Sequence, residues 1–304
     1  MIQDQLKHKY NRTKIVVLFF LLLFAIFFST TIGPSDISIR QVIFVVASNI
    51  PGLDSVFSID DLRPSQETII MQIRLPRVFL AALVGMGLAA SGTTFQGLLK
   101  NPMADPYIIG ISSGAALGAA LAIVTGISMA VGYFTVPLVA FIGAVISIFI
   151  VYHIARVGTK VPVYNLLLSG VALSAFLSAI TSLLMILNTN EMNQILFWML
   201  GSFSGRSWEH IQIAGPFILF GILALNFFSR ELNLMLFGEH TAQNLGVDVE
   251  KTKKLLLVLG SFTVASAVAV SGTIGFVGLI IPHSMRLIVG SDHRILMPTA
   301  ALGG

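Results

Sequence analysis

The sequence predicts an all-α polytopic membrane protein, and its composition is the first observation behind this prediction. Hydrophobic residues make up 55% of the 304 residues, charged residues make up 11%, and the mean hydropathy is +0.89. A soluble domain carries about 25% charged residues. Much of its surface must face water, so a soluble fold could not hide this much apolar surface. The composition therefore excludes disordered, collagen-like, coiled-coil and nucleic-acid-binding proteins.

The second observation is that apolar runs recur at the length a helix needs to cross a bilayer, about 20 residues. We expect eight spans, at 15–33, 76–99, 106–127, 129–155, 163–187, 211–229, 254–271 and 274–290. The first run follows a basic tail, residues 1–14, and lacks a small-residue cleavage site, so we expect it to be retained. Residues 295–304 resemble the start of a ninth span, and we therefore expect a C-terminally truncated chain.

Three segments between the predicted spans differ from short connectors. Residues 34–73 are predicted to form an external loop that contains Asp54, Asp60 and Asp61 and an amphipathic stretch, Ile37–Val46. Residues 230–253 are predicted to form a long cytoplasmic segment. Residues 195–204 are apolar but too short to cross, which indicates an interfacial or re-entrant piece. We expect the whole chain, residues 1–304, to form one transmembrane domain.

The distribution of basic residues predicts that the N-terminus lies in the cytoplasm. With this orientation 13 of the 18 Lys and Arg residues face inside, including every lysine. Cytoplasmic loops carry such an excess in membrane proteins, which also accounts for the net charge of +4 without a nucleic-acid partner. The residues left outside are Arg40, Arg63, Arg74, Arg77 and Arg206.

Small residues repeat at helical spacing within the spans. Gly110, Gly114 and Gly118 are four residues apart, as are Gly85 and Ala89. Such faces let helix backbones approach closely in a lipid environment, so we expect them to serve packing. A second face is small and mildly polar, and we predict that it lines a smooth translocation path; it consists of Ser169, Gly170, Ser174 and Ser178.

The sequence also disfavours several functions. No Asp, Glu, Lys or His falls at the centre of a predicted span, which argues against a stand-alone secondary transporter or a selective ion channel. There is no P-loop, so a nucleotide that powers transport would bind another chain. Cysteine is absent, which removes disulfides and thiolate sites, and the histidine spacing does not suit a metal site.

An intramembrane serine protease is a weaker alternative. Residues 110–114 match G-x-S-x-G with Ser112 at the centre, a pattern that requires a strand–turn–helix context. Here the context is a predicted span, and the candidate base is His283, near a span end. The short pattern arises easily in a Gly- and Ser-rich helix.

Two polar segments suggest contacts with other proteins. Arg74 and Arg77 lie where the external loop enters the second span, on the side where positive charge is unusual, and an arginine pair suits carboxylates of a partner. Residues 238–246 predict a short helix in the cytoplasmic segment, with Glu239 at its positive N-terminal end and Gly246 at the C′ position. Its length favours docking to a cytoplasmic protein.

At these residues the chain resembles the permease subunits of bacterial ABC importers for iron–siderophore, haem and vitamin B12. The matching stretches are Arg74–Arg77, Gly97-Leu98, Asn101–Pro106, Gly110–Gly114, Leu168–Ala172, Trp198–Ser202, Ala242, Leu245-Gly246, Gly275–His283, Arg286 and Asp292–Arg294. The resemblance implies a type II importer permease fold with ten spans and both ends inside. This sequence shows eight spans and the start of a ninth.

The resemblance also implies roles for individual residues. Arg74 and Arg77 correspond to external arginines that pair with a substrate-binding protein, periplasmic or lipoprotein. The cytoplasmic coupling helix that docks on the ATPase corresponds to Glu239, Ala242, Leu245 and Gly246, with His283 and Arg286 nearby. The span 163–187 corresponds to the helix that lines the path beside a second permease copy or a paralogue.

The function implied is that of a permease in the bacterial cytoplasmic membrane, not an enzyme. It would import a metal chelate, with ferric siderophore expected first and haem or cobalamin as alternatives. The chain itself would bind no cofactor, and ATP and Mg²⁺ would bind the partner ATPase. No metal site is expected.

Overall fold

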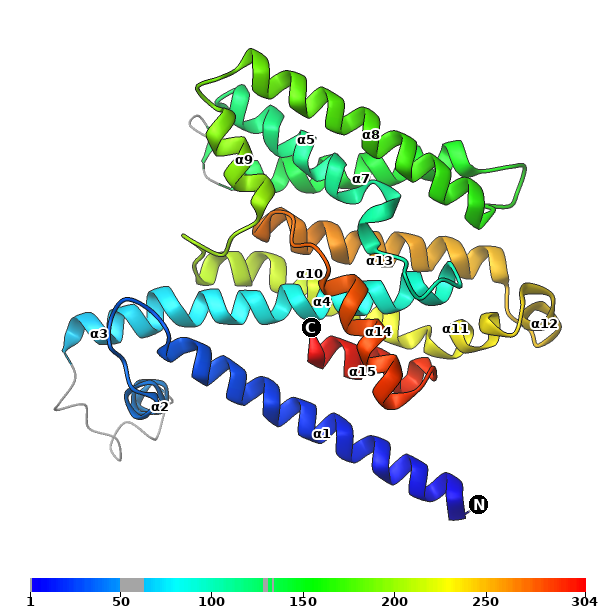
Figure 1. The fold of residues 1–304 in the computed structure, drawn as a ribbon, viewed down its shortest axis with the longest axis horizontal. Coiled ribbons are helices and arrows are strands. Elements are labelled where there is room, and N and C mark those ends of the chain that lie inside the picture. The colour runs from blue at the N-terminus through cyan, green and yellow to red at the C-terminus, as the bar shows by residue number, and fades with distance from the viewer. Residues whose placement is uncertain (1, 50–62, 128–130, 133) are drawn as a thin grey trace. The chain divides into compact units, whose positions relative to one another are not determined.

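A computed structural model describes residues 2–49, 63–127, 131–132 and 134–304 (Figure 1). Part of the predicted external loop, including Asp54, Asp60 and Asp61, lies outside these residues, as do 129 and 130 at the start of the fourth predicted span. The chain divides into two compact units. Unit 1 comprises Met1–Leu83 and Phe203–Pro216, and unit 2 comprises Val84–Ser202 and Phe217–Gly304. We describe each unit by itself, and the expectation of a single domain stays a prediction.

Unit 1 contains the N-terminal helices and the first parts of two long ones. Its helices are α1 (Ile2–Thr31), α2 (Ile39–Ser48), α3 (Pro64–Thr68), a π-helical segment (Ile69–Arg74), and the beginnings of α4 (Leu75–Leu98) and α10 (Trp208–Phe227). Helix α2 confirms the predicted amphipathic stretch, since Val42 and Val45 are fully buried. A capping box starts α2, in which the Ser38 hydroxyl accepts from the Gln41 amide and the Ser38 amide donates to the Gln41 side chain.

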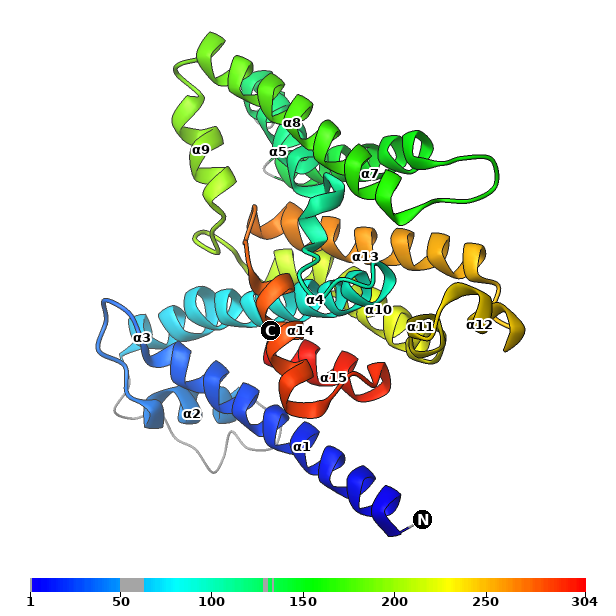
Figure 2. The ribbon, with the colours of Figure 1, turned by 45° about the vertical axis from the view of Figure 1, so that its right-hand side comes forward.

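Unit 2 contains the remaining helices, which Figures 1 and 2 show from two directions. After a 3₁₀ turn (Pro106–Ile109) they are α5 (Ile111–Val124), α7 (Thr135–Ala155), α8 (Val163–Leu187), α9 (Met192–Leu200), α11 (Ser229–Leu236), α12 (Glu239–Asn244), α13 (Val249–Ser271), α14 (Val277–Val289) and α15 (His293–Gly303). Helix α9 matches the short apolar piece predicted at 195–204. Its Ile195 packs on Ala120 and Ile123 of α5.

Helices occupy all eight ranges predicted as spans, but they differ in length. Six are long and apolar enough to cross a membrane: Thr13–Thr31, Pro64–Leu98, Thr135–Ala155, Val163–Leu187, Trp208–Phe227 and Val249–Ser271. The other two ranges hold the shorter α5 and α14. In the first of these the helix begins only at Ile111, because Pro106 starts a 3₁₀ turn that ends at Gly110 with a left-handed φ of 86°. The number of spans and their orientation stay predictions.

The predicted glycine face on α5 packs tightly against α7. A Cβ atom built on Gly114 would lie 2.5 Å from the Gly143 carbonyl oxygen, and one on Gly118 would overlap the Val139 carbonyl. The Ser147 hydroxyl of α7 donates to the Gly110 carbonyl over 2.7 Å. The two backbones are therefore in direct contact, and only glycine permits this approach.

We expect Gly114→Ala to destabilise the protein by about 1–3 kcal/mol, because the added methyl group must push α7 away. Thermal unfolding in detergent measures this. Gly215→Ala in α10 is the matched control, since a Cβ there would meet its nearest neighbour at 3.5 Å, an ordinary contact. Equal unfolding temperatures for the two variants would contradict the packing account.

Candidate functional site

Arg74, one of the two predicted docking arginines, is buried inside unit 1 with only 8% of its surface exposed. Its Nη1 donates to the carbonyls of Thr30 (3.0 Å) and Thr31 (2.8 Å), and its Nη2 donates to the carbonyl of Ser35 (2.7 Å). Thr31 is the last residue of α1, whose terminal carbonyls have no partner within the helix. Arg74 therefore caps α1, and the expected docking role would require this contact to open.

Gly33 makes the capping contact possible. A Cβ atom on this residue would lie 2.6 Å from Nη2 of Arg74 and 2.8 Å from its Cζ, so any side chain there would displace the guanidinium. The π-helical segment that carries Arg74 is held from another side, because the Trp208 indole donates to the Met71 carbonyl over 2.7 Å. These contacts join α1, the π-helical segment and the start of α10 within unit 1.

Arg77, the second predicted docking arginine, is half-buried. Its Nε finds no hydrogen-bond partner among the described residues, and the same holds for Nε of Arg206. Nη1 of Arg206 lies 3.3 Å from Nε2 of the buried His210, and burial lowers the pKa of Arg206. Arg206 is one of the arginines predicted to lie outside, but its sequence context predicted no role for it. The feature of the sequence that could have pointed to Arg206 is its position just after the apolar piece 195–204.

The predicted coupling helix is present as α12, and its C-terminal end has the predicted geometry. Gly246 has a left-handed φ of 87° and stands at the C′ position. Its amide donates to the Gln243 carbonyl over 2.9 Å, and the Val247 amide donates to the Ala242 carbonyl over 3.0 Å. These two bonds form a Schellman motif, which favours glycine at C′ because the residue there is left-handed.

An ion-pair network fixes α12 to α13. The Lys253 ammonium lies 2.7 Å from a carboxylate oxygen of Glu239 and 3.3 Å from one of Glu250. The other oxygen of Glu250 accepts from the Val161 amide over 3.2 Å, in the turn that precedes α8. Lys253 is only 5% exposed, so these contacts are screened less than surface ion pairs. The network connects α12, α13 and the start of α8.

The two apolar residues predicted for ATPase coupling lie at the C-terminal end of α12 and differ in exposure. Ala242 is fully buried, whereas Leu245 is 55% exposed. The side chain of Ala242 packs inside the chain, and its role in coupling to the ATPase stays a prediction. Because α12 has only six residues, the spacing of its apolar residues in the sequence could not predict which of them would be buried. A partner would meet Leu245.

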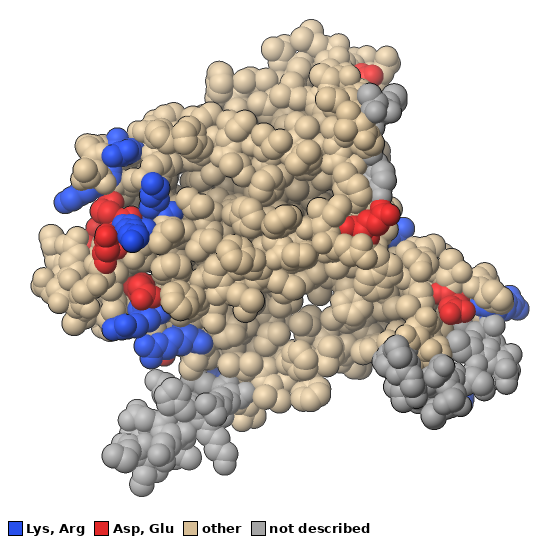
Figure 3. All heavy atoms as spheres, turned by 180° about the vertical axis from the view of Figure 1, so that it is seen from behind, with Lys and Arg blue, Asp and Glu red and all other residues tan. Residues whose placement is uncertain are grey.

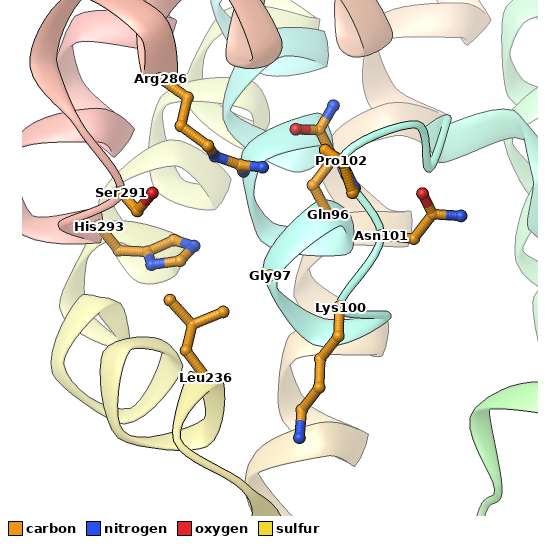
Figure 4. A pocket seen from close by; sticks show the side chains of 9 residues that line it. All are labelled: Gln96, Gly97, Lys100, Asn101, Pro102, Leu236, Arg286, Ser291 and His293. Atoms are coloured by element: carbon orange, nitrogen blue, oxygen red, sulfur yellow. The ribbon is translucent and has the colours of Figure 1, made fainter.

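The remaining predicted coupling residues lie on α14, and one of them borders a cavity. Arg286 lines this cavity together with Leu236, the last residue of α11 (Figure 4). Since α11 leads directly into α12, the structure brings Arg286 near the coupling segment. His283 lies further back on α14, half-buried, and its Nδ1 has no hydrogen-bond partner among the described residues.

The predicted path face of α8 is mostly covered by the chain itself. Ser169 and Gly170 are buried, and a Cβ on Gly170 would lie 2.5 Å from the Ile108 carbonyl of the 3₁₀ turn. Ser174 is half-buried and Ser178 is exposed. The small size of Gly170 permits close packing on the 3₁₀ turn, and the path role of Ser169 and Gly170 stays a prediction. Ser174 and Ser178 stay predictions.

The chain matches a known protein family over most of its length. A family model described as the FecCD transport family matches residues 21–304. The chain belongs to the FecCD transport family. It is thus a multi-pass protein of the cytoplasmic membrane, and family membership confirms the resemblance drawn from the motifs.

Two relatives and one solved structure illustrate this membership of the FecCD family. The chain is 46% identical to the cobalamin import system permease protein BtuC of Halobacterium salinarum, over 78% of this chain and 64% of the relative. It is 41% identical to the hemin transport system permease protein HmuU of Yersinia pestis, over 77% of this chain and 71% of the relative. The first relative is thus matched over less than two thirds of its length.

The solved structure is an inward-facing conformation of an ABC transporter described as of the metal-chelate type. It superposes with a TM-score of 0.80 at 32% identity and covers 95% of this chain and 85% of that chain. The protease alternative has no such support. Within the described residues no hydrogen bond joins Ser112 to a histidine, and Ser112 follows a 3₁₀ turn rather than a strand.

We expect Arg74→Lys to lower the stability of this FecCD-family protein by about 1.5–3 kcal/mol, because a single ammonium cannot replace the guanidinium fork at three carbonyls. Gly33→Ala should act in the same direction. Thermal unfolding in detergent measures both. The matched control is Arg40→Lys, since Arg40 is exposed and lies over the Phe44 ring at 5.3 Å. A stable Arg74→Lys variant would refute the capping role.

Proposed function

We infer that this chain is the membrane permease of an ATP-driven importer for a metal chelate. The observation that supports this best is α12, a short helix between α11 and α13. It exposes Leu245 and is tied to α13 through the buried Lys253. A helix of this kind suits the transfer of motion from a partner. Family membership and the ABC transporter likeness agree with this inference.

The partner that α12 would meet is an ABC ATPase, which binds ATP and Mg²⁺. The sequence has no P-loop, so nucleotide chemistry would belong to that subunit. Closure of the ATPases would push on Leu245 and its exposed neighbours. Glu239, Lys253 and Glu250 would pass this displacement to the turn at Val161 and so to the start of α8, as a rigid-body shift.

The outer partner is an extracytoplasmic substrate-binding protein with an acidic docking surface. Arg77 is the docking residue we favour, because its Nε lacks a partner in the described part of the chain while the guanidinium of Arg74 already caps α1. A carboxylate at Arg77 would form a charge-assisted hydrogen bond. Arg74 would contribute only if its capping contact opened on docking.

A second permease copy, or a paralogue, would complete the path. Helix α8 offers the surface for it, since only 11% of its most apolar 18-residue stretch is buried within the chain. Ser174 and Ser178 lie on this helix and would face the path. Figure 3 shows that Lys, Arg, Asp and Glu side chains gather in clusters, and most of the described surface in this view is uncharged, which suits lipid or apolar protein contact.

The cargo we favour is a ferric siderophore. Relatives at 46% and 41% identity are named for cobalamin and hemin, and both are alternatives for this chain. All three are bulky metal chelates, so a path of small, weakly polar side chains would suit each. Binding measurements of each chelate to the cognate substrate-binding protein would discriminate among them.

We expect uptake into vesicles to require ATP, the ATPase and the binding protein together. In that system Lys253→Met should reduce the amount of chelate imported per ATP hydrolysed by about fivefold or more, because α12 loses its link to α13. Lys253→Arg should restore coupling, and Lys251→Met is the control, since Lys251 is exposed on the same helix turn.

ATPase association and thermal stability of Lys253→Met are measured in parallel. Normal coupling in this variant would refute the proposed transmission route. Uptake that persists without any ATPase would instead favour the secondary transporter, the alternative of another class.

We expect Arg77→Glu to weaken docking of the binding protein by about 2 kcal/mol or more, roughly 30-fold in Kd, because the reversed charge would repel its carboxylates. Surface plasmon resonance at low and high salt measures the loss. Arg40→Glu is the matched control for net charge. Unchanged affinity in Arg77→Glu would exclude Arg77 from the docking surface.

A further inference from the structure

A cavity of about 160 Å³ opens in unit 2 where α4, α11 and α14 end and α15 begins (Figure 4). Its wall consists of Gln96, Gly97, Lys100, Asn101, Pro102, Leu236, Arg286, Ser291 and His293. The wall includes two cationic side chains, those of Lys100 and Arg286, and among the described residues it includes no carboxylate. None of these residues except Arg286 has a role in the transport function proposed above.

Gln96 places an unpartnered acceptor at this cavity. The side chain is 2% exposed, and its Nε2 donates to the Leu279 carbonyl over 3.0 Å, which fixes the orientation of the amide. The Oε1 atom then has no hydrogen-bond partner among the described residues. A buried acceptor left in this state costs about 1–3 kcal/mol, so an external donor would be favoured there.

His293 places a second unpartnered acceptor at the same cavity. The Asn233 Nδ2 donates to Asp292, so the Asn233 Oδ1 is the acceptor for Nδ1 of His293 at 2.9 Å. Nδ1 therefore carries the proton. Nε2 has no partner among the described residues, although His293 is only 1% exposed.

The imidazole of His293 is neutral, which leaves a lone pair on Nε2. Burial first, and then the nearby Arg286, lower the pKa of His293 to about 4, against the opposing effect of Asp292. His293 lies outside the six membrane-length helices. Gly97 permits the imidazole to lie this close to α4, since a Cβ there would lie 2.6 Å from Nε2.

Arg286 supplies the positive charge over this space. Figure 4 shows its guanidinium reaching down from α14 toward the cavity, with the edge of the His293 ring below it. Lys100 is exposed at the rim, and its side chain extends away from the cavity in this view. No ion pair joins Arg286 or Lys100 to a carboxylate within the described residues. An occupant should therefore be an anion.

We propose that this cavity binds a phosphate group that carries a proton, either inorganic phosphate or a phosphomonoester. Its P–OH would donate to His293 Nε2 or Gln96 Oε1, and its charged oxygens would accept from Arg286. A carboxylate or sulfate offers negative charge but no donor near neutral pH, so it would face two acceptor lone pairs. A phosphate group retains part of its proton there, since its second pKa is about 6.

The first experiment compares anions on the full chain in detergent at constant ionic strength. Binding of ³²P-labelled inorganic phosphate is measured at pH 6.5, with sulfate as competitor. We expect sulfate to bind about tenfold more weakly, the effect of one lost hydrogen bond to a charged ligand. Equal competition by sulfate, or no saturable phosphate binding, would overturn the proposal, and the cavity would then hold only water.

Variants test the named atoms. His293→Asn keeps a donor toward Asn233 but removes the Nε2 acceptor, and Arg286→Gln removes the charge. We expect each to weaken phosphate binding about tenfold. The matched control, Lys251→Gln, should bind as the native chain does. Because His293 is buried, the unfolding temperature is measured for every variant. If His293→Asn fails to fold, Arg286→Gln still tests the proposal, since Arg286 is partly exposed.

A final arm identifies the source of the phosphate group. The chain is reconstituted in nanodiscs of phosphatidylcholine with or without phosphatidic acid, a phosphomonoester lipid. Displacement of inorganic phosphate by phosphatidic acid would assign the cavity to a lipid headgroup, and unchanged binding would assign it to the free anion. Retention of native phosphate affinity in both Arg286→Gln and His293→Asn would refute the site. Transport need not be assayed, so failure here leaves the proposed importer function standing.

Discussion

The structure depends on how closely helices can pack when lipid surrounds them. Lipid tails are as apolar as the side chains, so the hydrophobic effect does not drive helices together, and contact between backbones must contribute instead. At Gly114 and Gly143 the α5 and α7 backbones meet with no side chain between them. The same constraint holds at Gly170, which is predicted to line the path and packs against the 3₁₀ turn. At this position packing and the proposed path both require a small residue.

Polar contacts gather where helices end, because the terminal carbonyls and amides have no partner within the helix. Arg74 satisfies carbonyls at the end of α1, and Glu250 satisfies an amide in the turn before α8. Lys253 joins two carboxylates from different helices. Each contact fixes one helix end to another element, so a force applied at α12 meets a rigid connection rather than a loose loop.

The sequence predicted the positions of the helices better than it predicted which of their residues are buried. Apolar length located α8 at Val163–Leu187 as expected, and Gly246 marked the end of α12. The buried position of Ala242 and the bonds of Arg74 to residues about 40 positions away could not be derived, because spacing describes one helix and says nothing of its neighbour. Family motifs did not help either, since a motif records that a residue matters and not whether it packs or binds.

The external arginines show why this distinction matters for function. Their position against the charge bias singled them out together, yet their surroundings differ. Arg74 has three acceptors within unit 1, whereas Nε of Arg77 and Nε of Arg206 have none among the described residues. A buried donor without a partner costs about 1–3 kcal/mol. A fold would gain by removing that cost, and a partner that supplies carboxylates would remove it on docking. For the proposed docking surface, Arg77, and with it Arg206, is therefore a better candidate than Arg74.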